Sequence, residues 1–222
     1  MNPELPQCPI VVLISGRGTN MRALIEISRR ADSPYTVARV LSDRPDATGL
    51  LIAAQLGIPA QAIDAGTFTD RAAFELRLAD AVAQSSPSLL ALAGFMRILS
   101  QAFVREFAGR ILNIHPSLLP LYPGLHTHRR VLAAGELVHG ATVHYVTAEL
   151  DGGPAVIQAR IAVGPDDDES SLARRVQALE HRIYPLAVRW HCEGRLRYAA
   201  GAAWFDAARL DAPLQLADIE AA

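Results

Sequence analysis

The chain has 222 residues, half of them apolar and a fifth charged, with a formal net charge of −2 at pH 7. This length suits one α/β domain or two small ones, and the charge gives no general attraction to nucleic acid or membranes. All 21 basic residues are arginine. The absence of lysine excludes a Walker phosphate loop, a Schiff-base aldolase and a pyridoxal-phosphate enzyme, because each needs a lysine.

Neither secretion nor membrane insertion is indicated by the sequence. No apolar run approaches the roughly 18 residues that a membrane-spanning helix needs, and the N-terminus lacks a signal-peptide pattern. We therefore expect a cytoplasmic protein. Cys8 and Cys192 lie near opposite ends without CxxC spacing, which disfavours a disulfide scaffold or a zinc–thiolate site.

The first half of the chain alternates between strand and helix patterns. An apolar run over 9–15 predicts a buried parallel strand, and a glycine turn and a helix over about 21–30 follow it. Further strands are predicted at 36–41, 60–63, 89–93 and 111–114, separated by helices at about 47–56, 69–84 and 101–107. This alternation indicates an α/β fold with a doubly wound, mostly parallel sheet, whose ligands bind at the carboxyl ends of the strands.

The pattern changes after the fifth predicted strand. Residues 116–127 contain three prolines and a glycine and should form a loop, and strands over 141–147 and 155–163 suit an antiparallel pair. A long helix is expected over about 171–188. The acids at 166–169 precede it, and they suit the helix dipole better than a metal. We expect an antiparallel extension of the sheet in the C-terminal half, with residues 201–222 as a peripheral tail.

The turn Gly16-Arg17-Gly18-Thr19-Asn20 lies between the first strand and the first helix. Free backbone N–H groups and the helix dipole make such a turn suitable for an anion. A third glycine at dinucleotide-fingerprint spacing is missing, and Asp43 is only a loose candidate for the acid of such a site. A single phosphate is the favoured ligand, and a tight turn without a ligand is the alternative.

Three polar residues at predicted strand ends suggest catalysis. Asn113 and His115 end the strand at 111–114, and Asp151 precedes a Gly-Gly-Pro turn. Together this polar trio can stabilise a carbonyl oxygen that becomes negative and can move a proton, which favours acyl transfer. His144 is a candidate to support them. Ser117 lacks the flanking glycines of a nucleophile elbow.

Other motifs allow two interpretations. The segment 93–99 could line a pocket for a flat heteroaromatic ring or simply pack a helix into the core. His126, His128 and His139 suit structural or loop roles better than a zinc site, because no nearby Cys, Asp or Glu completes a ligand set. No metal is expected.

Several segments together resemble the glycinamide ribonucleotide formyltransferases, a folate-dependent family of the formyl transferase superfamily. The resemblance covers about 10–198 and rests on the segments 15–20, 93–99, 113–120, 122–124, 139–144, 150–154, 177–181 and 184–185. We expect one domain over about 1–200. Its half at about 9–110 would bind phosphate, and its half at about 111–200 would bind folate and carry the catalytic residues.

The resemblance implies a reaction. The chain would transfer the formyl group of 10-formyltetrahydrofolate to the amine of N1-(5-phospho-D-ribosyl)glycinamide, yielding the N-formyl product and tetrahydrofolate in de novo purine biosynthesis. The folate would be a co-substrate and no metal would take part. The partners would be these small molecules, without nucleic acid or membrane, and the protein would be a monomer or a homodimer. Formyl-folate hydrolysis, a non-catalytic phosphate-binding module and, more weakly, a dehydrogenase are the alternatives.

The resemblance also implies roles for individual residues. The catalytic residues would be Asn113, His115 and Asp151. The ribonucleotide would contact Gly18, Thr19, Asn20, Gln177 and Glu180. The folate would contact Arg71, Met96, Arg97, Ile98, Leu99, Asn113, Thr147, Ala148, Glu149, Leu150 and Asp151. The loop 116–128 would close over the site.

Overall fold

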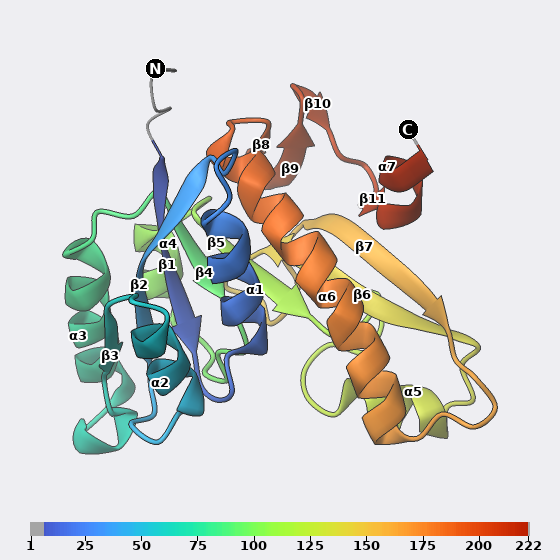
Figure 1. The fold of residues 1–222 in the computed structure, drawn as a ribbon, viewed down its shortest axis with the longest axis horizontal. Coiled ribbons are helices and arrows are strands. Elements are labelled where there is room, and N and C mark those ends of the chain that lie inside the picture. Colours follow the sequence, from blue (N-terminus) through green and yellow to red (C-terminus); the bar gives the residue numbers. More distant parts are fainter. Residues whose placement is uncertain (1–6, 222) are drawn as a thin grey trace.

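A computed structural model describes residues 7–221 (Figure 1). Within this range the main sheet has eight strands. In spatial order they are β11 (Leu214–Gln215), β7 (Ala155–Ala162), β6 (Val138–Tyr145), β5 (Ile111–His115), β4 (Leu89–Leu92), β1 (Cys8–Ile14), β2 (Tyr35–Ser42) and β3 (Ala60–Ala62). A separate three-stranded sheet consists of β8 (Leu196–Ala199), β9 (Ala202–Phe205) and β10 (Ala208–Arg209).

Helices cover both faces of the main sheet (Figure 1). One face packs against α1 (Thr19–Ser28), α2 (Thr48–Gln55) and α6 (Glu169–Cys192), and the other against α3 (Arg71–Ala83) and α4 (Gln101–Glu106). The burial of β1 on both of its faces explains why its sequence is continuously apolar. Its residues point alternately into the two cores, and all five from Ile10 to Ile14 are buried. The remaining helices are η1 (Ala65–Thr67), α5 (Thr127–Ala133) and α7 (Leu216–Ala221).

The strand pairing confirms the predicted fold class. Strand β1 pairs in parallel with β2 and β4, and β4 pairs in parallel with β5. Strand β6 then runs antiparallel to both β5 and β7. The doubly wound sheet with an antiparallel extension therefore brings the carboxyl ends of β1, β4 and β5 to one edge.

Several element boundaries differ from the sequence-based expectation. Helix α1 begins at Thr19, two residues early, and α6 extends from Glu169 to Cys192 instead of ending at 188. Of the acids at 166–169, Asp168 is the N-cap of α6, and its side chain accepts a hydrogen bond from the Ser171 N–H at 2.7 Å. Helix α5 was not expected, because its seven residues are too few for a periodic apolar pattern.

Residues after 200 take part in both sheets. Strand β9 pairs with β8 in the small sheet, and the ring of Phe205 on β9 lies 4.8 Å from the ring of Trp190 on α6. Strand β11 adds to the main sheet in parallel beside β7. None of the helices within residues 7–221 has both the length and the apolar character to span a lipid bilayer.

Candidate active site

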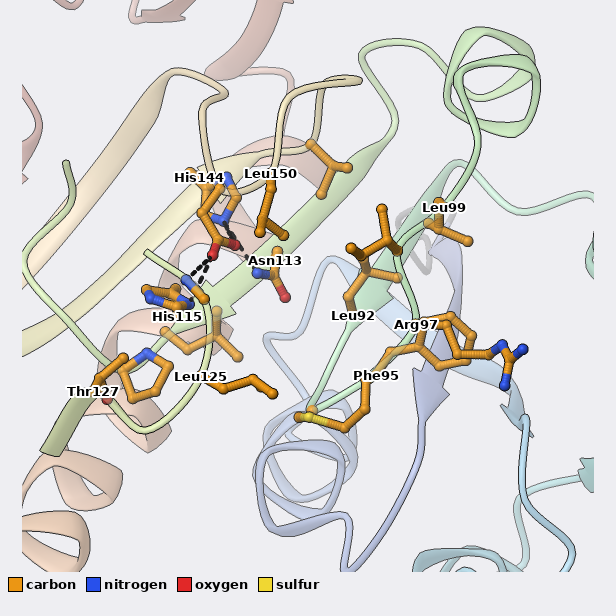
Figure 2. Close-up of a pocket in the computed structure, with 18 of the residues that line it drawn as sticks. Leu92, Phe95, Arg97, Leu99, Asn113, His115, Leu125, Thr127, His144 and Leu150 are labelled. Carbon is orange, nitrogen blue, oxygen red and sulfur yellow. Dashed lines mark hydrogen bonds and ion pairs between the residues drawn. The ribbon is translucent and has the colours of Figure 1, made fainter. Parts of the chain in front are cut away.

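The structure brings the polar trio together around His144, and Figure 2 shows Asn113, His115 and His144 close to one another. Asn113 and His115 are two residues apart on β5 and therefore face the same side, and Asp151 comes from the turn between β6 and β7. His115 Nδ1 lies 3.5 Å from Asp151 Oδ2, and His144 Nε2 lies 3.8 Å from Asp151 Oδ1. His115 and His144 are buried, and the Asp151 side chain is only 9% exposed.

His144 sets the orientation of Asn113. The Tyr145 carbonyl, which can only accept, lies 3.0 Å from His144 Nδ1, so this nitrogen carries the hydrogen. Burial lowers the pKa of His144 to about 4, which keeps the ring neutral near pH 7 and makes Nε2 an acceptor. Asn113 Nδ2 lies 3.1 Å from that Nε2 and donates to it. One amide hydrogen of Asn113 is thereby fixed, and the second is available to a ligand.

His115 has an acceptor at each ring nitrogen. Its Nε2 lies 3.0 Å from the Tyr122 carbonyl oxygen, and its Nδ1 faces the Asp151 carboxylate. A doubly protonated ring would satisfy both partners. Asp151 Oδ2 also accepts a hydrogen bond from Gly124 N–H at 2.8 Å. Backbone groups of the loop between β5 and α5 therefore contact two members of the trio. The resemblance implied that this loop would close over the site, but it did not indicate these two backbone contacts.

The turn that carries Asp151 has an unusual backbone. Asp151 adopts φ +51°, a left-handed conformation that is uncommon outside glycine. At Gly153 an added Cβ would lie 1.8 Å from the Tyr145 carbonyl oxygen, so no other residue fits there without displacing the strand. Glycine at position 153 is thus required for the turn that brings the Asp151 carboxylate against β5.

A buried hydroxyl holds the loop before α5. Thr142 Oγ1 donates to the Ser117 carbonyl at 2.7 Å and accepts from the Leu119 N–H at 3.1 Å. Gln158 pairs with Thr142 across β6 and β7, and its Nε2 donates to the Leu119 carbonyl at 2.8 Å. Sequence reasoning missed Thr142 and Gln158. The signal available was a polar residue at an inward position of each apolar strand.

A cavity of about 360 Å³ opens beside the trio (Figure 2). Asn113, His115, His144 and Asp151 form one wall. Every residue assigned to folate from the resemblance lines this cavity except Arg71, which lies at the start of α3 with its Nε 3.5 Å from Glu75. The lining residues from that prediction are Met96, Arg97, Ile98, Leu99, Asn113, Thr147, Ala148, Glu149, Leu150 and Asp151.

A second cavity of about 520 Å³ lies at the N-terminus of α1. It shares Gly94, Met96, Ile114, Pro116 and His128 with the first, so the two are adjacent. All five residues assigned to the ribonucleotide line it: Gly18, Thr19, Asn20, Gln177 and Glu180.

The second cavity has the character of an anion site at one end. Gly18 adopts φ +70° at the N-cap position, and within residues 7–221 no side chain caps this helix. Its first N–H groups and the helix dipole therefore favour an anion. Gln177 Nε2 donates to Thr19 Oγ1 at 2.9 Å.

The other end of this cavity is a buried polar pair. Asn20 Nδ2 donates to Glu180 Oε2 at 2.7 Å. Burial raises the pKa of Glu180, and Asn20 Oδ1 is buried with no partner among the described residues. A hydroxyl or amine of a ligand would satisfy that oxygen.

The remaining histidines do not form a metal centre within residues 7–221. His128 Nδ1 and His139 Nε2 lie 3.1 Å apart, and burial lowers the pKa of both rings, that of His139 to about 4. No three His, Cys, Asp or Glu side chains in that part of the chain are arranged to hold a metal ion. The Ser117 hydroxyl donates to the Leu121 carbonyl at 2.6 Å, so it braces the loop.

Comparison with known proteins identifies the family. Residues 8–188 match the family model described as formyl transferase. The phosphoribosylglycinamide formyltransferase of Escherichia coli (strain K12) is 49% identical over 201 residues, covering 90% of this chain and 95% of the relative. The trifunctional purine biosynthetic protein adenosine-3 of Drosophila melanogaster is 44% identical over 181 residues, which are 81% of this chain and 13% of that protein.

Solved structures agree with the sequence comparison. The phosphoribosylglycinamide formyltransferase of Coxiella burnetii, solved in complex with CHES, matches with a TM-score of 0.89 and 45% identity, covering 94% of this chain and 99% of that one. The matched family region contains β1 to β7 and most of α6, and therefore the trio and both cavities. The chain belongs to the formyl transferase family.

Proposed function

We propose that this chain transfers the formyl group of 10-formyltetrahydrofolate to the amine of glycinamide ribonucleotide, as a step of de novo purine biosynthesis, and that Asn113, His115 and Asp151 are its catalytic residues. One observation carries the proposal: an oriented amide and a histidine–carboxylate pair line a cavity that adjoins an anion site. The family and its named relatives support the reaction class.

The ribonucleotide would occupy the cavity at α1. Its phosphate would accept hydrogen bonds from the backbone of Gly18, Thr19 and Asn20 and from Gln177, whose amide already points at Thr19. Glu180 would contact the glycinamide end. The buried, unpartnered Asn20 oxygen next to Glu180 supports a polar ligand in this position.

The folate would occupy the cavity lined by 96–99 and 147–151. Backbone groups of these two segments would bind the edges of its pteridine ring, and apolar side chains such as Leu92 would contact the ring face. Arg71, half-exposed at the start of α3 outside this cavity, would attract the negatively charged tail of the folate.

Formyl transfer requires stabilisation of a negative oxygen and movement of one proton. The amine nitrogen forms a bond to the formyl carbon, the bond from that carbon to N10 breaks, and a proton passes from the amine to N10. The second amide hydrogen of Asn113 would donate to the formyl oxygen as it becomes negative. His115 would add a second donor once Nε2 releases the Tyr122 carbonyl.

Asp151 would stabilise the protonated His115 ring and accept the amine proton through a water molecule. No metal is needed in this scheme, because the formyl group on N10 is already activated and oxyanion donors with a proton relay suffice. Turnover that survives exhaustive chelation is the expected result. Its loss after chelation, with recovery on adding a divalent ion, would refute the metal-free scheme.

The deciding experiment compares the wild type with Asp151→Asn in formyl transfer from 10-formyltetrahydrofolate to glycinamide ribonucleotide, followed optically. Asn tolerates the left-handed backbone and can still accept from Gly124 N–H, so the fold should persist. We expect a rate loss of at least about 10²-fold. Asp166→Asn, at an exposed position before α6, is the matched control.

Three outcomes are informative. Near-wild-type turnover in Asp151→Asn would refute the assignment of the carboxylate. Formate release by the wild type without ribonucleotide would indicate hydrolysis of the folate. Folate binding without transfer would indicate a different formyl acceptor.

A further inference from the structure

Asp43 is a buried acid that the proposed reaction does not use. It follows directly after β2 and is 5% exposed, and among the described residues it lines neither cavity. Its position at the end of the second strand would suit the acid of a dinucleotide site. The carboxylate is already engaged by protein groups, however, so another role is needed.

Asp43 starts a short series of hydrogen bonds that crosses the sheet edge. Its Oδ1 accepts from the Ser15 hydroxyl at 2.5 Å, and Ser15 Oγ in turn accepts from the Met96 N–H at 2.8 Å. The Ser15 N–H also donates to the Gly94 carbonyl at 3.0 Å. Arg97 Nη1 lies 3.7 Å from Asp43 Oδ2.

The direction of these bonds depends on the acid. A serine hydroxyl has one hydrogen, and a carboxylate can only accept. The Ser15 hydrogen therefore points at Asp43, and the lone pairs of the Ser15 oxygen are left to accept from the Met96 N–H. Because Ser15 and Asp43 are both buried, water does not replace these bonds without structural change.

The two segments joined in this way meet at the boundary between the two cavities. Ser15 immediately precedes the glycine turn at α1 and lines the second cavity. Met96 lines both cavities, and residues 97–99, which follow it, line only the first. A shift of Ser15 relative to Met96 would therefore move the two cavities relative to each other.

We propose that Asp43 is a positioning residue. By fixing the Ser15 hydroxyl, it holds the glycine turn at α1 and the 96–99 segment in a fixed position relative to each other. This inference rests on the proposed function, in which an amine bound in one cavity must meet a formyl carbon bound in the other. A misplacement of about 1 Å can lower such a rate by about 10²-fold.

The test compares four variants and one control variant with the wild type in the formyl-transfer assay. Asp43→Ala and Ser15→Ala should each lower kcat by about 10- to 100-fold, and the effect of the double variant should not exceed that of either single one. Asp43→Asn should retain near-wild-type kcat, because its Oδ1 can still accept from Ser15. Asp80→Ala, at an exposed position on α3, is the control.

Two results would overturn the inference. If Asp43→Asn is as slow as Asp43→Ala, the charge facing Arg97 matters instead of the bond to Ser15. If Asp43→Ala and Ser15→Ala lower only the melting temperature and leave kcat unchanged, the hydrogen bonds support the fold alone. Should Asp43→Ala fail to fold, Ser15→Ala and Asp43→Asn still decide between these cases.

Ligand binding separates this inference from the proposed function. Calorimetry with the ribonucleotide and with a non-reactive folate measures each Kd separately, without turnover. A wild type that binds both ligands and transfers nothing would refute the proposed function. In that case, the affinity for each ligand is measured again with the other ligand bound. If both alanine variants match the wild type in this measurement, the two cavities have not moved relative to each other, and the positioning role is refuted as well.

Discussion

Replacing His144 with glutamine should make the protein less sensitive to acid. His144 is 2% exposed, and its burial lowers the pKa from 6.5 to about 4. Above pH 6.5 the ring is neutral in both folded and unfolded chains, so it contributes no pH dependence. As the pH falls from 6.5 to 4, the unfolded chain binds a proton that the folded protein excludes, and stability is lost.

The magnitude follows from the two pKa values. Their separation corresponds to about 3 kcal/mol of stability lost by pH 4, in a window that lies entirely below pH 6.5. His139, whose pKa is also lowered to about 4, contributes in the same direction. It is unchanged in the variant, so its contribution cancels in the comparison.

Urea unfolding of wild type and His144→Gln at pH 7.5, 5.5 and 4.5 measures this effect. The free energy of unfolding of the wild type should fall more steeply with acid, so the difference between the two proteins should change by about 2 to 3 kcal/mol in favour of the variant over this range. Parallel losses of stability in both proteins would refute the argument that His144 is held neutral by burial.

The two cavities and the loop before α5 give three further predictions. His144→Leu removes the acceptor that orients the Asn113 amide, and kcat should fall by about 10- to 100-fold with the KM of both substrates little changed; a change in KM alone would contradict this. Gly18→Ala forces a side chain into φ +70°, 3.1 Å from the Gly49 Cα, and should raise the KM for the ribonucleotide but not for folate. Thr142→Val removes the buried hydroxyl that holds the loop before α5 and should lower the free energy of unfolding by about 1 to 3 kcal/mol; an unchanged urea midpoint would show that the loop is held by other contacts.

The sequence was most informative where local patterns carry the structure. Continuous apolar runs located β1 and the other central strands, because a parallel strand buried on both faces tolerates few polar residues. Asn113 and His115 could be selected because polar residues at the end of such a run have few structural reasons to be there. The glycine turn before α1 was recognisable because its glycines directly follow the apolar run of β1.

Short elements and contacts between distant segments could not be read in the same way. Strands β10 and β11 have two residues each, too few for any periodicity. The contacts of Tyr122 and Gly124 with the trio use backbone atoms, which every residue has. The bond between Ser15 and Asp43 joins residues 28 positions apart, and no local pattern links the two.

By itself, then, the sequence determined the doubly wound sheet, the strand ends where ligands would bind and the identity of the polar trio, because burial and turn chemistry act over a few residues. The tertiary structure alone decided the state and direction of these groups. His144 is neutral because the fold buries it, Asn113 points where that neutral ring accepts its hydrogen, and Asp151 reaches β5 because Gly153 lets its turn approach β6. Protonation and orientation depend on neighbours distant in the chain, and the folded arrangement supplies those neighbours.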